Sequence, residues 1–514
     1  MRIRQAIWPL AFVAWSGAAA AQDPATQAMP EAFAPPAWLS DTVTAPHANI
    51  ATSAAPRAIT VMPIGAVRLD AVGLLPRSVT GLPDDLWANS EAASLAELFL
   101  RQPTEGLPAI QAFTEMLALA ELDPPQDAGQ EAALFLARVD MLLNRGALAQ
   151  ARELIERAGP TNPRVFRRWF DVSLLTGQSA RACAAMRANP DIAPTYPARI
   201  FCLARSGDWP AAALSLGTGE ALGFITQSDA DLIARFLDPE LFEGQPPLPP
   251  ETEMTPLHYE MRISLGERPS SVGLPLAFAQ SDLADIAGWH AQLDATERLM
   301  RAGAIEAGQW QNIYLSRVPS ASGGVWDRVA ALQAFDTALL ARDPMGIERT
   351  LAPAVEAMRA VNLVTPFATL YAEPLSRQPL TGEAAELAHM IGLLGQGYEA
   401  LAQTTVPQSE NTRRLFAIAK GEPVAALPGD GPLEAAVTAA FADITPPERY
   451  LGLLQTGRSG EALLRASLIL SSGDGSDVDD LADALRLLRA LGLEGVARQS
   501  ALQLILLESD RGGI

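Results

Sequence analysis

The segment from Glu131 to Pro163 constrains the fold more than any other part of this 514-residue chain. Apolar residues recur at helical spacing through its first half, which predicts an amphipathic helix that ends at Asn144-Arg145-Gly146. Gly146 can adopt the positive φ of a helix end, and a second helix follows with apolar residues along one face. Pro163 then closes the unit, because a proline cannot continue a helix. The segment is therefore predicted to form a helical hairpin.

The glycine of this turn is followed five residues later by a small alanine and four residues after that by an apolar residue. Five instances of this longer pattern each follow a leucine-rich helical stretch, and Gly395 with Ala400 is a weaker sixth. The pairs are Gly146 and Ala151, Gly177 and Ala182, Gly207 and Ala212, Gly457 and Ala462, and Gly492 and Ala497. Neighbouring glycines lie 31, 30 and 35 residues apart.

This pattern resembles the tetratricopeptide repeat, which has a period of about 34 residues. That family places glycine, small, large and small apolar residues and then proline at the spacing of Gly146, Ala151, Ile155, Ala158 and Pro163. The resemblance implies an all-α fold, a right-handed α-solenoid of stacked hairpins. Such a solenoid has a concave groove that binds peptides or other proteins.

Composition shifts along the chain predict six segments. They are a signal peptide at 1–21, a disordered Ala/Pro-rich linker at 22–58, an extended or short-strand arm at 59–90, an N-terminal solenoid at 91–243, a Pro-rich joint at 244–256 and a C-terminal helical solenoid at 257–514. The linker has recurrent proline and little apolar periodicity, which is typical of disorder. The joint is too rich in proline to be helical.

The N-terminal residues have the pattern of a cleavable secretory leader. Arg2 and Arg4 form its charged end, residues 6–13 form its apolar core, and Ala19-x-Ala21 predicts cleavage after Ala21. The apolar core is shorter than the roughly 18 residues that span a bilayer, and no later apolar run is long enough. We therefore expect an exported protein of the bacterial periplasm without membrane insertion.

Charge restricts the partners of this protein. The formal net charge is −21, and it falls to −23 when Arg2 and Arg4 leave with the leader. A field of this sign repels nucleic acid and anionic lipid, so neither is an expected partner. An acidic groove favours basic segments of a protein partner.

The two cysteines predict a disulfide. Cys183 and Cys202 lie in successive predicted helices, about equally far from the turn at 189–194. An antiparallel hairpin brings them level, and an oxidising compartment favours the bond. The alternative is a pair of buried free thiols; a redox-active pair is disfavoured because there is no C-x-x-C motif.

The sequence assigns no catalytic, cofactor-binding or metal-ligating residue, and we expect no enzyme and no cofactor. The histidines, at positions His47, His258, His290 and His389, are widely separated and lack metal-ligand spacing. No nucleophile or phosphate-binding motif occurs. The acidic run at 474–480 lacks the spacing of a calcium loop, and we interpret it as a helix start that Ser476 caps.

The leading functional hypothesis is a periplasmic scaffold or adaptor that binds an envelope protein through the solenoid groove. One alternative is an accessory component of an envelope machine such as the flagellar motor. Another is an enzyme that acts on peptidoglycan or polysaccharide through an unrecognised carboxylate pair; Glu434 and Asp443 are by default exposed helix charges. The enzyme hypothesis predicts two close, partly buried carboxylates with perturbed pKa values in a cleft.

Overall fold

The computed structural model describes residues 68–407, 409–424, 431–472 and 477–508. These residues form helices, turns and one isolated bridge between Leu75 and Ala120, and they contain no strand. The predicted all-α class is therefore confirmed for the part of the chain that the structure describes. The predicted signal peptide, the linker and the start of the arm at 59–67 lie outside it. None of the described helices combines the length and apolar character needed to cross a membrane.

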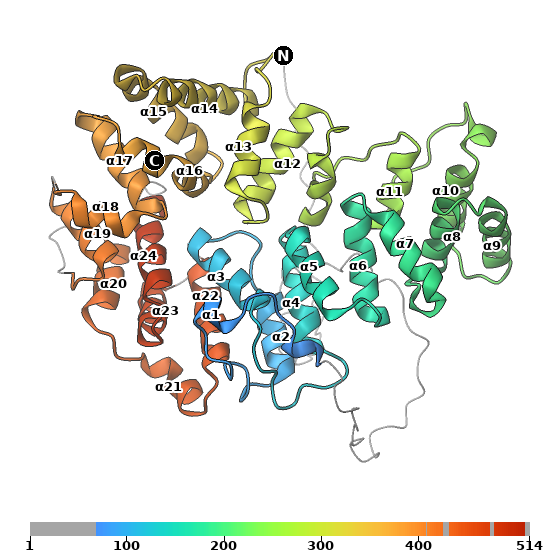
Figure 1. The fold of residues 1–514 in the computed structure, drawn as a ribbon, viewed down its shortest axis with the longest axis horizontal. Coiled ribbons are helices and arrows are strands. Elements are labelled where there is room, and N and C mark those ends of the chain that lie inside the picture. Colours follow the sequence, from blue (N-terminus) through green and yellow to red (C-terminus); the bar gives the residue numbers. More distant parts are fainter. Residues whose placement is uncertain (1–67, 408, 425–430, 473–476, 509–514) are drawn as a thin grey trace, which may run out of the picture. The chain divides into compact units, whose positions relative to one another are not determined.

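Most consecutive helices are joined by short connections, and residues 120–132 and 243–255 are longer ones (Figure 1). The first third comprises η2 (Leu69–Ala71), α1 (Arg77–Thr80), α2 (Ala92–Leu100), α3 (Pro108–Leu119), α4 (Ala133–Asn144), α5 (Leu148–Ala158), α6 (Pro163–Leu175), α7 (Ser179–Ala188), η3 (Pro190–Ile192), α8 (Tyr196–Arg205), α9 (Trp209–Ala221), α10 (Gln227–Leu237) and η4 (Pro239–Phe242). The middle comprises α11 (Pro256–Ser264), η5 (Leu276–Leu283), α12 (Trp289–Arg301), α13 (Ala307–Leu315), α14 (Val325–Leu340), α15 (Pro344–Arg359), α16 (Val364–Ser376), α17 (Gly382–Leu394) and α18 (Tyr398–Thr404). The last part comprises α19 (Glu410–Lys420), α20 (Pro432–Ala442), α21 (Glu448–Gln455), α22 (Ser459–Ser472), α23 (Val478–Ala490) and α24 (Glu494–Glu508).

The five expected glycine turns are present. Each glycine has a positive φ, between 70° and 86°, and lies between two helices. Each alanine five residues later is 0% exposed, so a larger side chain would separate the paired helices. Pro163 has a different role from the one predicted. α5 already ends at Ala158, and Pro163 is the first residue of α6, where its missing N–H has no intrahelical partner to lose.

The hairpin turns differ in what surrounds them, which predicts unequal effects of Gly146→Ala and Gly177→Ala. A Cβ at Gly146 would lie 2.7 Å from Leu299 Cδ2 and 3.3 Å from Leu276 O, whereas one at Gly177 would meet nothing within 4 Å. We expect Gly177→Ala to cost about 1 kcal/mol, for the positive φ alone. Gly146→Ala should cost about 1–2 kcal/mol more, for the added crowding. Urea denaturation measures the free energy of unfolding of both variants. Equal losses would contradict the expected crowding of the added Cβ against η5 and α12.

The end of the chain packs against its beginning. α22 contacts α2 and α3, and α24 contacts α3 (Figure 1). Gln102 Nε2 donates to Leu464 O at 3.1 Å, and Ala109 N donates to Gln503 Oε1 at 2.9 Å. The second bond satisfies an N–H in the first turn of α3, which has no side-chain cap of its own. The hairpins therefore do not form a simple array of sequential neighbours; the first and last ones share one hydrophobic core.

The predicted cysteine pair lies in the predicted hairpin. Cys183 belongs to α7 and Cys202 to α8, and their sulfur atoms are 1.96 Å apart, which is a disulfide distance. Both side chains are buried. Residues 243–255, which include most of the expected Pro-rich joint, contain no helix between η4 and α11.

Candidate functional site

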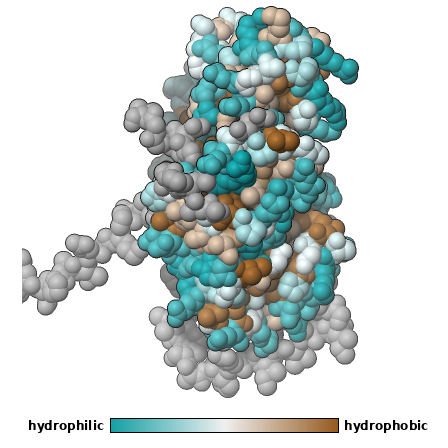
Figure 2. Space-filling view, turned by 90° about the vertical axis from the view of Figure 1, so that its left-hand side faces the viewer, coloured by the Kyte–Doolittle hydropathy of each residue, from teal (hydrophilic) through white to brown (hydrophobic). Residues whose placement is uncertain are grey.

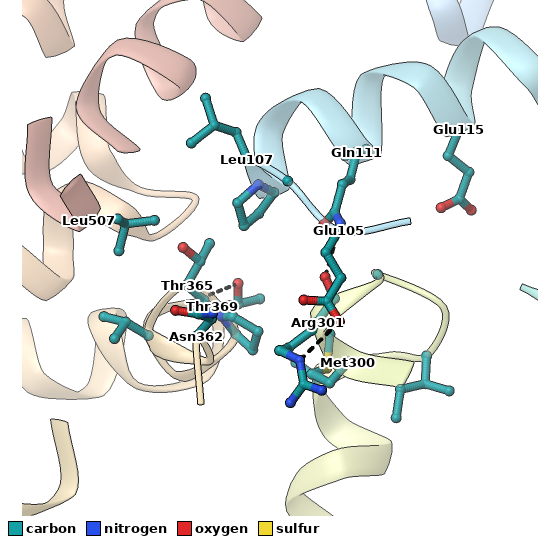
Figure 3. A pocket seen from close by; sticks show the side chains of 18 of the residues that line it. Glu105, Leu107, Gln111, Glu115, Met300, Arg301, Asn362, Thr365, Thr369 and Leu507 are labelled. Atoms are coloured by element: carbon teal, nitrogen blue, oxygen red, sulfur yellow. Dashed lines mark hydrogen bonds and ion pairs between the residues drawn. The ribbon is translucent and has the colours of Figure 1, made fainter. Parts of the chain in front are cut away.

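A cavity of about 610 Å³ lies where six distant segments of the chain meet, and we call it the junction cavity (Figure 3). Its walls come from 105–115 at α3, from Gln150 of α5, from 300–307 between α12 and α13, from 359–369 between α15 and α16, from 470–471 at the end of α22, and from Leu507 of α24. No single hairpin supplies this cavity. It forms where the connections at 300–307 and 359–369 and the ends of α22 and α24 meet α3.

The walls of the junction cavity combine charged, polar and apolar side chains. Gln111 and Glu115 extend from α3, and Arg301 lies opposite them (Figure 3). Arg301 Nε forms an ion pair with Glu105 Oε1 at 3.1 Å. Leu107 of the same stretch is among the apolar lining residues.

Glu115 is the titratable group of the cavity with a perturbed pKa. Burial raises the pKa of Glu115, and the negative charge of Glu306 raises it further. The charge of Arg145 and a hydrogen bond from Gln150 oppose these effects without cancelling them. The cavity therefore disfavours an unpaired negative charge at Glu115.

Arg145 supports the α3 wall from behind. It is buried, and its guanidinium donates to Pro103 O at 3.3 Å, to Gln111 O at 3.2 Å and to Thr114 Oγ1 at 2.8 Å. Burial lowers the pKa of Arg145 to about 10, although the charge of Glu115 opposes this. The turn residue of the Asn144-Arg145-Gly146 motif thus positions the helix that carries Gln111 and Glu115.

A second unusual surface lies on α9. We call the exposed residues Trp209, Ala213, Leu214, Gly217, Thr218 and Leu222 the α9 face. Leu214 is 74% exposed and Leu222 is 61% exposed. By contrast, the side of the molecule that carries α17–α20 shows hydrophobic residues in separate patches between hydrophilic ones (Figure 2).

The structure does not assemble the histidines into a site. His258 Nε2 lies 2.8 Å from Asp229 Oδ1, and His290 packs edge-on against Trp326. His258 and Asp229 also line a second cavity of about 620 Å³ between α6, α8, α10 and α11. No group of three or more potential metal ligands occurs among the residues that the structure describes. His47 lies outside them.

The acidic run near 474–480 starts a helix, but a different residue caps it. Asp477 Oδ1 accepts a hydrogen bond from Asp479 N at 3.1 Å and so caps α23. Ser476, the predicted cap, lies outside the described residues. Glu434 and Asp443 line neither cavity.

Sequence reasoning did not identify Gln111, Glu115 or Glu306. Gln111 and Glu115 lie in α3 and Glu306 directly before α13, none of them in a motif, and only the packing of distant segments brings them to one cavity. Comparison of this chain with protein-family models, curated proteins and solved structures gave no match. What the protein binds must therefore be inferred from its own geometry and charge.

Proposed function

We propose that this protein is a periplasmic interaction protein that docks a segment of an envelope protein on the α9 face. The observation that carries the proposal is that the outer surface of α9 exposes large apolar side chains and a single charged one. Its only charged residue is Glu220, whereas the following helix α10 carries Asp229, Asp231 and Arg235. The extracytoplasmic location rests on the N-terminal leader and is supported by the cysteine pair at disulfide distance.

The packing of α9 explains why this face needs a partner. α9 packs on α8 and α10, and its buried residues are Ala212 and Gly219. A surface helix of a globular protein usually carries charged and polar residues on its outer face. Leu214 and Leu222 are instead large apolar residues that are exposed on this face. Their exposure indicates that another chain covers them.

The surroundings of the α9 face indicate the chemistry of the partner. Residues 206–243 contain one basic residue, Arg235. They contain seven acidic ones, Asp208, Glu220, Asp229, Asp231, Asp238, Glu240 and Glu243. A basic amphipathic helix would place apolar side chains on Leu214 and cations beside these carboxylates. A second copy of this acidic chain would bring like charges together, which disfavours self-association through this face.

Site-specific crosslinking in the producing cells tests the proposal. A photoreactive residue at Thr218 should capture one dominant envelope protein through a basic, apolar-striped segment. The same residue at Leu340 of α14, which is 77% exposed where Leu214 is 74% exposed, should not. With the captured segment as a synthetic peptide, Leu214→Glu should weaken binding roughly tenfold or more, while Leu340→Glu should leave it unchanged.

The other outcomes of this experiment separate the alternatives. Capture of a component of a membrane-anchored motor would specify the accessory role. Capture of wall glycan in place of protein would contradict the proposal and favour the carbohydrate-acting enzyme. Equal capture from positions 218 and 340 would show that the α9 face has no special affinity.

A further inference from the structure

The junction cavity is separate from the α9 face and has the size of a small-molecule site. Ligand pockets commonly enclose about 300–1,000 Å³, and this one encloses about 610 Å³. None of its lining residues belongs to α8, α9 or α10. A ligand of this cavity would therefore bind at a different site from the protein partner proposed above.

The charges of the cavity wall leave an excess of carboxylate. Arg301 is paired with Glu105, and Arg359 is paired with Glu356. The remaining acidic lining residues, Glu115 and Glu306, form no ion pair with any described residue, although the charge of Arg145 behind α3 acts on Glu115. Their mutual repulsion is relieved if a cation enters the cavity.

Two amide side chains of the wall offer acceptor oxygens, those of Gln111 and Gln150. Gln111 is 5% exposed, and its Nε2 donates both hydrogens, to Thr104 O at 3.1 Å and to Arg301 O at 3.0 Å. The amide oxygen of Gln111 is thus left to accept. Gln150 Oε1 is buried and has no hydrogen-bond partner within the described ranges. A buried acceptor without a partner is costly, so a donor that reaches it gains free energy on binding.

We propose that the junction cavity binds a small organic cation. A primary ammonium or guanidinium group is held by the carboxylates of Glu115 and Glu306 and the amide oxygens of Gln111 and Gln150. The aliphatic chain of the ligand packs on apolar lining residues, which include Leu107, Met300, Ile305, Val364 and Leu470. These cationic groups have three to five N–H donors and no acceptor, which matches these two carboxylates and two amide oxygens.

The proposal has a defined pH dependence. Glu115 holds a cation best when it is ionised, so the affinity rises as the pH rises through the raised pKa of Glu115, and binding releases protons. The groups that set this pKa besides burial are Arg145 behind α3, Gln150 of α5, and Glu306 before α13.

Calorimetric titration of the full mature chain at low salt tests the site. The probes are 1,5-diaminopentane and agmatine, with 1,5-pentanediol and glutarate as neutral and anionic counterparts. We expect saturable binding of the two cations only. An end-blocked lysine peptide is added as a separate probe; if it binds more tightly than the free amines, the cation is a side chain of a polypeptide and the free-ligand proposal fails.

Two variants and one matched control test whether the binding depends on Glu115 and on the open cavity. Glu115→Gln should weaken diamine binding by roughly tenfold or more, because one charged hydrogen bond is lost. Ala112→Phe should abolish binding by filling the cavity while it leaves Glu115 in place. Glu121→Gln removes the same charge from an exposed residue just after α3 and should change the affinity less than about twofold.

Equal effects of the Glu115 and Glu121 substitutions, preferred binding of glutarate, or no saturable heat with either cation would overturn the proposal. Misfolding of Glu115→Gln is not expected. The site already disfavours the ionised carboxylate, so the neutral amide should be at least as stable at neutral pH, and a thermal melt checks this.

Discussion

Replacing Arg138 with alanine should lower the free energy of unfolding by about 3–5 kcal/mol, because it removes one side of a buried charged network. Arg138 is fully buried in α4. Its guanidinium donates to Ala118 O at 2.6 Å, to Ala120 O at 2.8 Å and to Asp70 O at 3.3 Å. The substitution leaves these carbonyl oxygens without their donor and leaves the Asp70 carboxylate without its nearest cation.

The loss caused by Arg138→Ala should depend on pH. Burial raises the pKa of Asp70, although the hydrogen bond from Phe135 N and the charge of Arg138 lower it. An acid with a raised pKa in the folded state contributes less stability as the pH rises through that pKa. Without Arg138 the pKa of Asp70 rises further, so the destabilisation should be larger at about pH 8 than at about pH 5.5.

Urea denaturation at both pH values, with hydrogen exchange of α3 and α4, measures the effect. Arg157→Ala, which removes an exposed arginine from the neighbouring helix α5, is the matched control and should cost less than about 0.5 kcal/mol. Arg138→Lys keeps the charge, but one ammonium group cannot reproduce the planar fork, so a substantial part of the loss should remain. Equal stability of Arg138→Ala and Arg157→Ala would show that the buried network contributes nothing.

Removing the link between Cys183 and Cys202 should cost about 3 kcal/mol, the second-largest effect that we expect. The two residues are 19 positions apart, so the bond restricts a loop of this length in the unfolded chain. Both are buried between α7 and α8, where alanine leaves only a small space. The loss should be concentrated in these two helices, and hydrogen exchange should show it there first.

Two samples distinguish the effect of the disulfide crosslink on stability from the effect of side-chain packing. Wild-type protein in reductant loses the bond and keeps its side chains, whereas the double variant Cys183→Ala, Cys202→Ala loses both. Similar destabilisation of the two samples would assign the effect to the crosslink. Free thiols in protein purified from the envelope under alkylating conditions would contradict the expected bond.

The sequence determined the helical hairpins, because their information is local. A glycine that needs positive φ and an alanine five residues later, as at Gly146 and Ala151, mark a turn and a close helix pair without reference to the rest of the chain. The cysteine pair was predictable for the same reason, since Cys183 and Cys202 belong to one hairpin. Pro163 was assigned to the wrong side of a boundary, because proline is as suited to the first residue of a helix as to the space after one.

Only the tertiary structure decided how the ends of the chain meet and what lies between them. The bond from Ala109 N to Gln503 Oε1 joins residues 394 positions apart, and no local periodicity specifies which distant helix supplies such a partner. The same holds for Gln111 and Glu115, which in the sequence are ordinary polar residues of α3. Gln111 donates to the carbonyl oxygen of Arg301 at the end of α12, and the charges of Arg145 and Glu306 act on Glu115, so segments distant in sequence create this environment. Hydrophobic spacing encodes which face of a helix is buried, but the choice of neighbour depends on the shape and hydrogen-bond complementarity of whole surfaces.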